Sequence, residues 1–178
     1  MKKLLIALGC TAAMVCSSNI FAVGTINGNL TVQLTIGNGC SVTGGSTGGA
    51  VNDFGTLDFG QYSSLADIIT GQSTGTSGAI QIQCTTALPY TVKLDNGQNA
   101  TGSQRRLIGG VSPSNDYINY SLFQDASRTL PWNSAGAGIL SAQGTGNAVN
   151  MIVYGLVPAQ TTPAQGLYSD IVLVTVDW

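Results

Sequence analysis

A strict alternation of apolar and polar residues at positions 25–36 constrains the fold more than any other feature of this sequence. In an extended chain, large apolar side chains would lie on one face and polar side chains on the other. This period of two is typical of a β-strand with one buried face. Ordering such a strand costs about as much free energy as burying its side chains provides, so it must lie against a sheet edge or a groove. The apolar row consists of Ile26, Gly28, Leu30, Val32, Leu34 and Ile36.

Short alternating segments follow along the rest of the chain, and turn residues separate them. Residues 37–49 and 52–62 are read as short strands among glycines, residues 71–78 form a polar Gly/Ser/Thr stretch, and 95–97 (Asp-Asn-Gly) predict a tight turn. No long window beyond the first residues of the chain has a helical period. About eight short strands separated by turns predict an all-β fold, a β-sandwich. The remaining predicted strands are 80–84, 90–94, 106–108, 117–123, 147–156 and 168–178.

The charged residues are few, and they narrow the possible functions. Only 8% of the 178 residues are charged, against about 25% in typical domains. All eight acids are aspartates, and the chain contains no histidine. A histidine-based triad, a histidine-ligated zinc site and glutamate acid/base chemistry are therefore excluded. The net charge of −2 and the absence of a basic patch do not favour nucleic-acid binding.

The aspartates do not form an evident catalytic or metal-binding pattern. Asp53 and Asp58 are close in sequence, but five positions along a strand place them on opposite faces. Solvated turn and edge positions are favoured over a catalytic pair, and no calcium-loop spacing occurs. We therefore expect no catalytic residue and no metal site.

The amino terminus has the features of a secretory signal peptide. Residues 1–3 are a short basic region, residues 4–15 are apolar, and 20–22 (Ile-Phe-Ala) form an acceptable cleavage site. The apolar run is shorter than the roughly 20 residues that span a bilayer, so a membrane anchor is the weaker alternative. Lipidation at Cys10 or Cys16 is another weaker alternative.

Only Cys40 and Cys84 would remain after cleavage at that site. Two cysteines in an exported chain most simply form one disulfide. The alternative is a pair of buried free thiols, which an oxidising compartment disfavours.

Two interpretations of the strand at residues 25–36 are open from the residues alone. It is either the first strand of its own sandwich, or a strand that completes the sandwich of a neighbouring subunit by β-augmentation. The alternation continues unbroken to Ile36, so the pattern does not divide a donor part from an own first strand.

Motifs in a fixed order along the chain resemble the spore coat protein U domain family, which includes subunits of archaic chaperone–usher pili. The resemblance begins with the signal peptide and the alternating strand that leads to Cys40, and it extends to the last residue. The quoted motifs are Asp58-Phe59-Gly60-Gln61-Tyr62, Ile80-Gln81-Ile82-Gln83-Cys84, Tyr90-Thr91-Val92, Leu122 with Asp125, Trp132, Tyr154-Gly155, Val157-Pro158-Ala159-Gln160, Gly166-Leu167-Tyr168-Ser169-Asp170 and Val174-Thr175-Val176-Asp177-Trp178.

The resemblance implies an incomplete immunoglobulin-like β-sandwich that is completed by donor-strand complementation. It divides the chain into a signal peptide (1–22), a donor or first-strand segment (23–36) and a pilin domain (37–178). The implied donor residues are Ile26, Gly28, Leu30, Val32 and Leu34. The implied acceptor edge is the C-terminal strand, with Tyr168, Ile171, Leu173, Val174, Val176 and Trp178.

The resemblance also implies a function and partners. The chain would be a structural pilin of a cell-surface pilus involved in adhesion and biofilm formation. Its partners would be neighbouring pilin subunits, a periplasmic chaperone, an outer-membrane usher, and minor or tip subunits. No cofactor, nucleic acid or small-molecule substrate is implied.

Two alternatives from other classes remain. One is a monomeric module that binds carbohydrate or a surface through Tyr117, Tyr120 and Trp132, although these side chains are expected to pack in the core or in a strand pair. The other is a secreted glycosidase that uses aspartate pairs.

Overall fold

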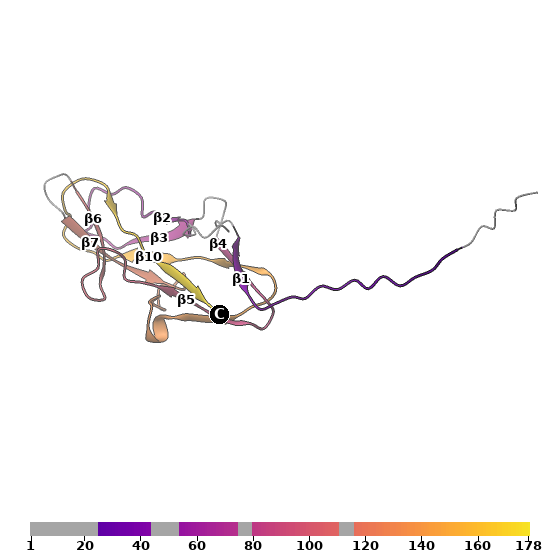
Figure 1. Cartoon of the computed structure of the whole chain (residues 1–178). Helices are drawn as coiled ribbons and strands as arrows, with labels where there is room; N and C mark the ends of the chain where they lie inside the picture. Colours follow the sequence, from indigo (N-terminus) through magenta and orange to yellow (C-terminus); the bar gives the residue numbers. More distant parts are fainter. Residues whose placement is uncertain (1–24, 44–53, 75–79, 111–115) are drawn as a thin grey trace, which may run out of the picture. The chain divides into compact units, whose positions relative to one another are not determined.

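A computed structural model describes residues 25–43, 54–74, 80–110 and 116–178 (Figure 1). The expected signal peptide lies outside the described residues. The chain separates into two units, Met1–Thr35 and Ile36–Trp178. We describe each unit by itself.

The second unit is built from short antiparallel strands, and the described residues contain no α-helix, only the 3₁₀ turn η1 (Gly136–Gly138). The predicted all-β class is confirmed. The strands are β1 (Cys40–Thr43), β2 (Thr56–Leu57), β3 (Ile69–Thr74), β4 (Ile80–Cys84), β5 (Pro89–Leu94), β6 (Arg105–Gly109), β7 (Asp116–Phe123), β8 (Leu140–Gln143), β9 (Ala148–Met151), β10 (Tyr154–Val157), β11 (Tyr168–Ser169) and β12 (Val174–Asp177).

These strands form three antiparallel sheets. The largest sheet has the order β11-β6-β7-β10-β3-β2, and the other two have the orders β1-β4-β9 and β12-β5-β8. β6 and β7 pair over five residues, from Arg105 opposite Tyr120 to Gly109 opposite Asp116. β2 and β11 are the edges of the large sheet, and β12 is an edge of its own sheet.

The core is formed by alternate residues of the longer strands. Tyr90, Val92 and Leu94 of β5 are buried, and so are Tyr120 and Leu122 of β7. Alternate side chains of a strand point to opposite faces, so each strand contributes one face to a common cluster. Trp132 is 1% exposed, and its indole N–H donates to the Val92 carbonyl at 3.0 Å.

Several strand predictions are corrected by the structure. The segment 147–156, predicted as one strand, divides into β9 and β10, and 168–178 divides into β11 and β12. In both cases the chain passes from one sheet to another. The alternation of apolar and polar residues continues through the crossing, because each of the two sheets turns one face toward the core. β8 and β3 lie in stretches for which the sequence predicts no strand.

The strand predicted at residues 25–36 is not formed, because these residues pair with no described strand. No helix among the described residues is long and apolar enough to cross a membrane.

Candidate functional site

The apolar row of the amino-terminal segment is exposed. Ile26 is 98% exposed, Leu30 86%, Val32 84% and Leu34 87%. A Cβ atom added to Gly28 would meet no heavy atom within 4 Å. Burying each of the large side chains would stabilise a complex by about 1.5–3 kcal/mol. The segment therefore carries the pattern of a half-buried strand without a described partner.

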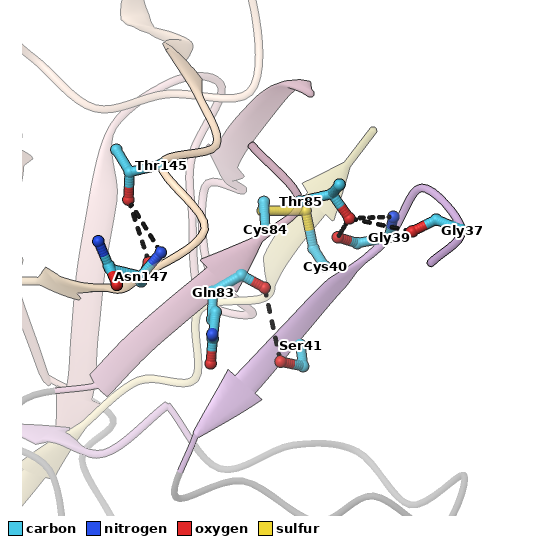
Figure 2. Close-up of a disulfide and its surroundings, with 9 residues drawn as sticks. All are labelled: Gly37, Gly39, Cys40, Ser41, Gln83, Cys84, Thr85, Thr145 and Asn147. Carbon is cyan, nitrogen blue, oxygen red and sulfur yellow. Dashed lines mark hydrogen bonds between the residues drawn. A yellow bond between two sulfur atoms is a disulfide. The ribbon is translucent and has the colours of Figure 1, made fainter. Parts of the chain in front are cut away.

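The disulfide between Cys40 and Cys84 fastens the chain where β1 begins. The two cysteines face each other in the β1–β4 pairing, and their sulfur atoms are 2.03 Å apart, which confirms the predicted pair. The Thr85 hydroxyl accepts a hydrogen bond from the Gly39 N–H at 3.2 Å and lies 3.1 Å from the Gly37 carbonyl oxygen (Figure 2). The Thr85 N–H donates to the Gly39 carbonyl at 3.0 Å. Residues 37–40 are thus held against the end of β4.

A groove of about 960 Å³ reaches the hydrophobic core within the unit Ile36–Trp178. Ile82, Val92, Leu94 and Trp132 line its depth, and each of them is 1% exposed. Phe54 to Leu57 and Phe59 line it, and we call this segment the β2 bank; residues 170–174 line it as well, and we call them the β12 bank. The sandwich therefore has an apolar opening that leads directly to its core.

The β2 bank depends on two glycines in the neighbouring strands. Gly71 of β3 and Gly155 of β10 are directly paired. A Cβ atom on Gly155 would lie 2.7 Å from Phe59 and 2.9 Å from Leu57, and a Cβ atom on Gly71 would lie 3.2 Å from both side chains. These glycines leave room for Leu57 and Phe59 to pack against the sheet.

The β12 bank is an alternating segment with one inward face. Val172 and Val174 are half-buried and pack against the core, whereas Ile171 and Leu173 are 64% and 55% exposed. The Leu173 carbonyl accepts from the Asp95 N–H at 3.0 Å. β12 continues this pairing with β5 along the same edge. The other backbone edge of β12 pairs with no described strand.

The residues predicted for the acceptor edge thus lie in three environments. Tyr168, Val174 and Val176 pack against the core. Ile171 and Leu173 line the groove, as does Val174, and Trp178 is exposed at the end of the chain.

Sequence reasoning did not identify the β2 bank, nor Val172 on the β12 bank. The alternation of 170–176 would have indicated Val172, which shares a row with Val174 and Val176.

Two carboxylates line the groove, and both are engaged by backbone N–H groups. Asp95 accepts hydrogen bonds from the Gly97 and Leu173 N–H groups, both at 2.9 Å. Asp170 accepts hydrogen bonds from the Gln98 and Asn99 N–H groups at 3.0 and 3.2 Å. These contacts favour structural roles for both aspartates.

The residues considered for the two alternative functions, a binding module and a glycosidase, do not gather in one site. Tyr120 and Trp132 are buried, as expected, while Tyr117 is 42% exposed and lies beneath the Arg106 guanidinium at 4.0 Å. The three aromatic side chains therefore do not form a common binding platform. Asp58 is exposed and accepts from the Gly60 N–H at 2.8 Å, and Asp53, the nearby aspartate in the sequence, lies outside the described residues. Among the described residues, no three potential metal ligands cluster together.

Comparison with solved structures finds a similar chain in the crystal structure of the CsuC–CsuE chaperone–tip adhesion subunit pre-assembly complex from archaic chaperone–usher Csu pili of Acinetobacter baumannii. The similarity has a TM-score of 0.48 at 17% sequence identity and covers 81% of the present chain. The present chain spans 41% of the length of that chain.

Sequence comparisons cover nearly the whole chain. Protein U of Myxococcus xanthus is 32% identical over 98% of this chain and 97% of its own length. Residues 26–175 match the Spore Coat Protein U domain, so the match includes the exposed amino-terminal row, the disulfide and both banks of the groove. The chain therefore belongs to the Spore Coat Protein U domain family.

Proposed function

We propose that this chain is a structural pilin subunit that polymerises by donor-strand exchange into a cell-surface pilus. The observation that carries the proposal is the presence, in one chain, of an exposed segment with alternating apolar and polar residues and of an apolar groove that opens the core. The segment pairs with no described sheet, and the groove lies beside an edge strand whose outer backbone groups pair with no described strand. A second copy of this chain supplies what each of them lacks.

In this proposal, residues 23–36 are the donor segment and residues 37–178 are the pilin domain, after removal of a signal peptide at 1–22. The donor residues Ile26, Leu30, Val32 and Leu34 enter the groove of the next copy, and Gly28 takes the position with the least space. The backbone of residues 170–177 pairs with the donor backbone. Val172, Val174 and Val176 pack beside the donor side chains.

The proposal extends to assembly partners and location. A periplasmic chaperone occupies the groove first, and an outer-membrane usher exchanges it for the donor segment of the next subunit. Neighbouring copies and minor or tip subunits complete the fibre. The motifs also closely resemble the major subunit of the Csu pilus, which supports a role in adhesion and biofilm formation.

The proposal is tested by electrophoresis of the purified protein in SDS without heating. We expect a ladder of oligomers that heating collapses to a monomer, because the strand-completed sandwich resists SDS. Deletion of residues 25–30 should abolish the ladder, and so should Leu30→Asp, which places a charge on the apolar row. Thr31→Asp places the same charge on the opposite face and should leave the ladder intact.

A peptide of residues 25–36 separates loss of the donor from misfolding of the groove. Leu30→Asp retains its own groove, so it should bind this peptide as tightly as the variant that lacks residues 25–30 does. A wild-type protein that remains a stable monomer and does not bind the peptide would contradict the proposed function.

A further inference from the structure

Asp170 stands at the point where the chain leaves one sheet and enters another. It directly follows β11, which pairs with β6 in the large sheet, and it precedes β12, which pairs with β5. The intervening residues 170–173 belong to no strand, although they form most of the β12 bank. The position of this bank therefore depends on contacts other than a regular strand ladder.

The half-buried carboxylate of Asp170 supplies several of these contacts, beside the hydrogen bonds that the Ile171 and Leu173 carbonyls accept from the Gln98 and Asp95 N–H groups. One oxygen, Oδ2, accepts a hydrogen bond from the Tyr120 hydroxyl at 2.7 Å. The other, Oδ1, accepts from the backbone N–H groups of Gln98 and Asn99 at 3.0 and 3.2 Å, and from Asn99 Nδ2 at 2.9 Å. Hydrogen bonds to a carboxylate are about twice as strong as those between neutral groups. Asp170 thus ties the β12 bank to β7 and to the turn that follows β5.

Tyr120 contacts both banks of the groove. It is 4% exposed on β7, and its ring meets Phe59 of the β2 bank edge-on, with ring centroids 6.4 Å apart. Its hydroxyl donates to Asp170 of the β12 bank. Burial, together with this hydrogen bond, raises the pKa of the phenol, so the hydroxyl remains a donor. One buried side chain therefore links the two banks.

We propose that Tyr120 and Asp170 are positioning residues that hold the two banks at the separation an entering strand requires. This inference rests on the proposed function, with the donor segment of a second copy as the occupant. The β12 bank is then ordered before the donor arrives, and less conformational entropy is lost when the donor binds. Removal of the Tyr120 hydroxyl lets residues 170–173 move. It slows uptake of the donor segment more than it speeds release of that segment.

The test uses the full mature chain with Trp178→Phe, so that the fluorescence of Trp132 in the groove reports occupancy. The protein is unfolded in guanidinium with its disulfide intact and is diluted into an excess of a peptide of residues 25–36. Association and dissociation rate constants are measured for Tyr120→Phe, for Asp170→Asn and for the double variant. Tyr117→Phe, on the same strand and exposed, is the matched control.

We expect Tyr120→Phe to slow association about tenfold, as the loss of a hydrogen bond to a charged group allows. Dissociation should change less than threefold, and Tyr117→Phe should match the wild type. The double variant should be no slower than the slower single variant, because the two residues act through one contact. Wild-type association rates in both single variants, or an equal slowing in Tyr117→Phe, would overturn the inference while peptide uptake still supports the proposed function. Failure of the wild type to take up the peptide would reject both.

Discussion

The Arg105 guanidinium donates a hydrogen bond of 2.9 Å to the backbone carbonyl of Trp132, in the most buried part of the core. The same group donates to the carbonyls of Leu94, at 3.1 Å, and of Asp95. Burial lowers the pKa of Arg105, and the nearby Tyr120 and aspartates oppose this effect. A cation that is 4% exposed thus satisfies carbonyl groups at the end of β5 and beside the groove.

We expect Arg105→Lys to lower the free energy of unfolding by about 2–3 kcal/mol, because an ammonium group lacks the planar fork that serves several carbonyls at once. Arg106→Lys is the matched control. Arg106 is the next residue on β6 and is only partly buried, and it donates to the Asn99 carbonyl. Urea unfolding of both variants measures the difference. Equal losses in the two variants would contradict the role assigned to Arg105.

Stability should fall at alkaline pH through Tyr120. Its pKa is raised because burial disfavours the phenolate and because the hydroxyl donates to Asp170. Its unfolded-state pKa is about 10, so the stabilisation from the neutral phenol is complete below that pH. As the pH rises above about 10, the unfolded chain loses this proton first, and the free energy of unfolding decreases.

Urea unfolding at intervals between pH 8.5 and 11.5 tests this prediction. The free energy of unfolding should fall more steeply with pH in the wild type than in Tyr120→Phe, which lacks the titrating group. Parallel curves for the two proteins would assign the alkaline sensitivity to other residues.

Replacing both cysteines by serine should lower the free energy of unfolding by about 4 kcal/mol on the chain-entropy model. The expectation follows from the separation of 44 residues between Cys40 and Cys84. The double variant avoids leaving a lone thiol, and it should also give a lower yield of folded protein in the periplasm. Thermal unfolding measures the effect, and an unchanged transition would argue against a stabilising bridge.

Two glycines between β5 and β6 give a matched pair of substitutions. Gly97 and Gly102 both have positive φ values, 78° and 59°. A Cβ atom on Gly97 would overlap the Asp170 carboxylate, whereas one on Gly102 would meet no heavy atom within 4 Å. Gly102→Ala should therefore cost about 1 kcal/mol from backbone strain alone, and Gly97→Ala about 3 kcal/mol or more. Equal losses would show that contact with Asp170 is unimportant to stability.

Much of the fold could be predicted because its main signals are local. The alternation in β5 and β7 indicates which side chains are buried, and the buried positions at Val92 and Leu122 agree with it. The pairing of Cys40 with Cys84 followed from their being the two cysteines left after the predicted cleavage. A change of sheet could not be predicted in this way. β9 and β10 pair with different strands, but their apolar and polar residues alternate with the same period.

The candidate site was only half visible in the sequence. The exposed amino-terminal row was recognisable from Ile26 to Leu34, but the groove depends on contacts between distant residues. Leu57 and Phe59 form a bank because Gly71 and Gly155 are paired beneath them. Asp170 meets Tyr120 across 50 positions, and no periodic pattern connects the two.

The disulfide at the start of β1 has a mechanical consequence. It joins the first residue of β1 to the last residue of β4, at the end of the pairing nearest the amino-terminal segment. A pulling force applied through residues 25–39 meets this covalent bond before it reaches the hydrogen bonds between β1 and β4. β1 therefore cannot separate from β4 starting at that end. The disulfide transmits the force directly to β4, whose residue Ile82 is part of the core.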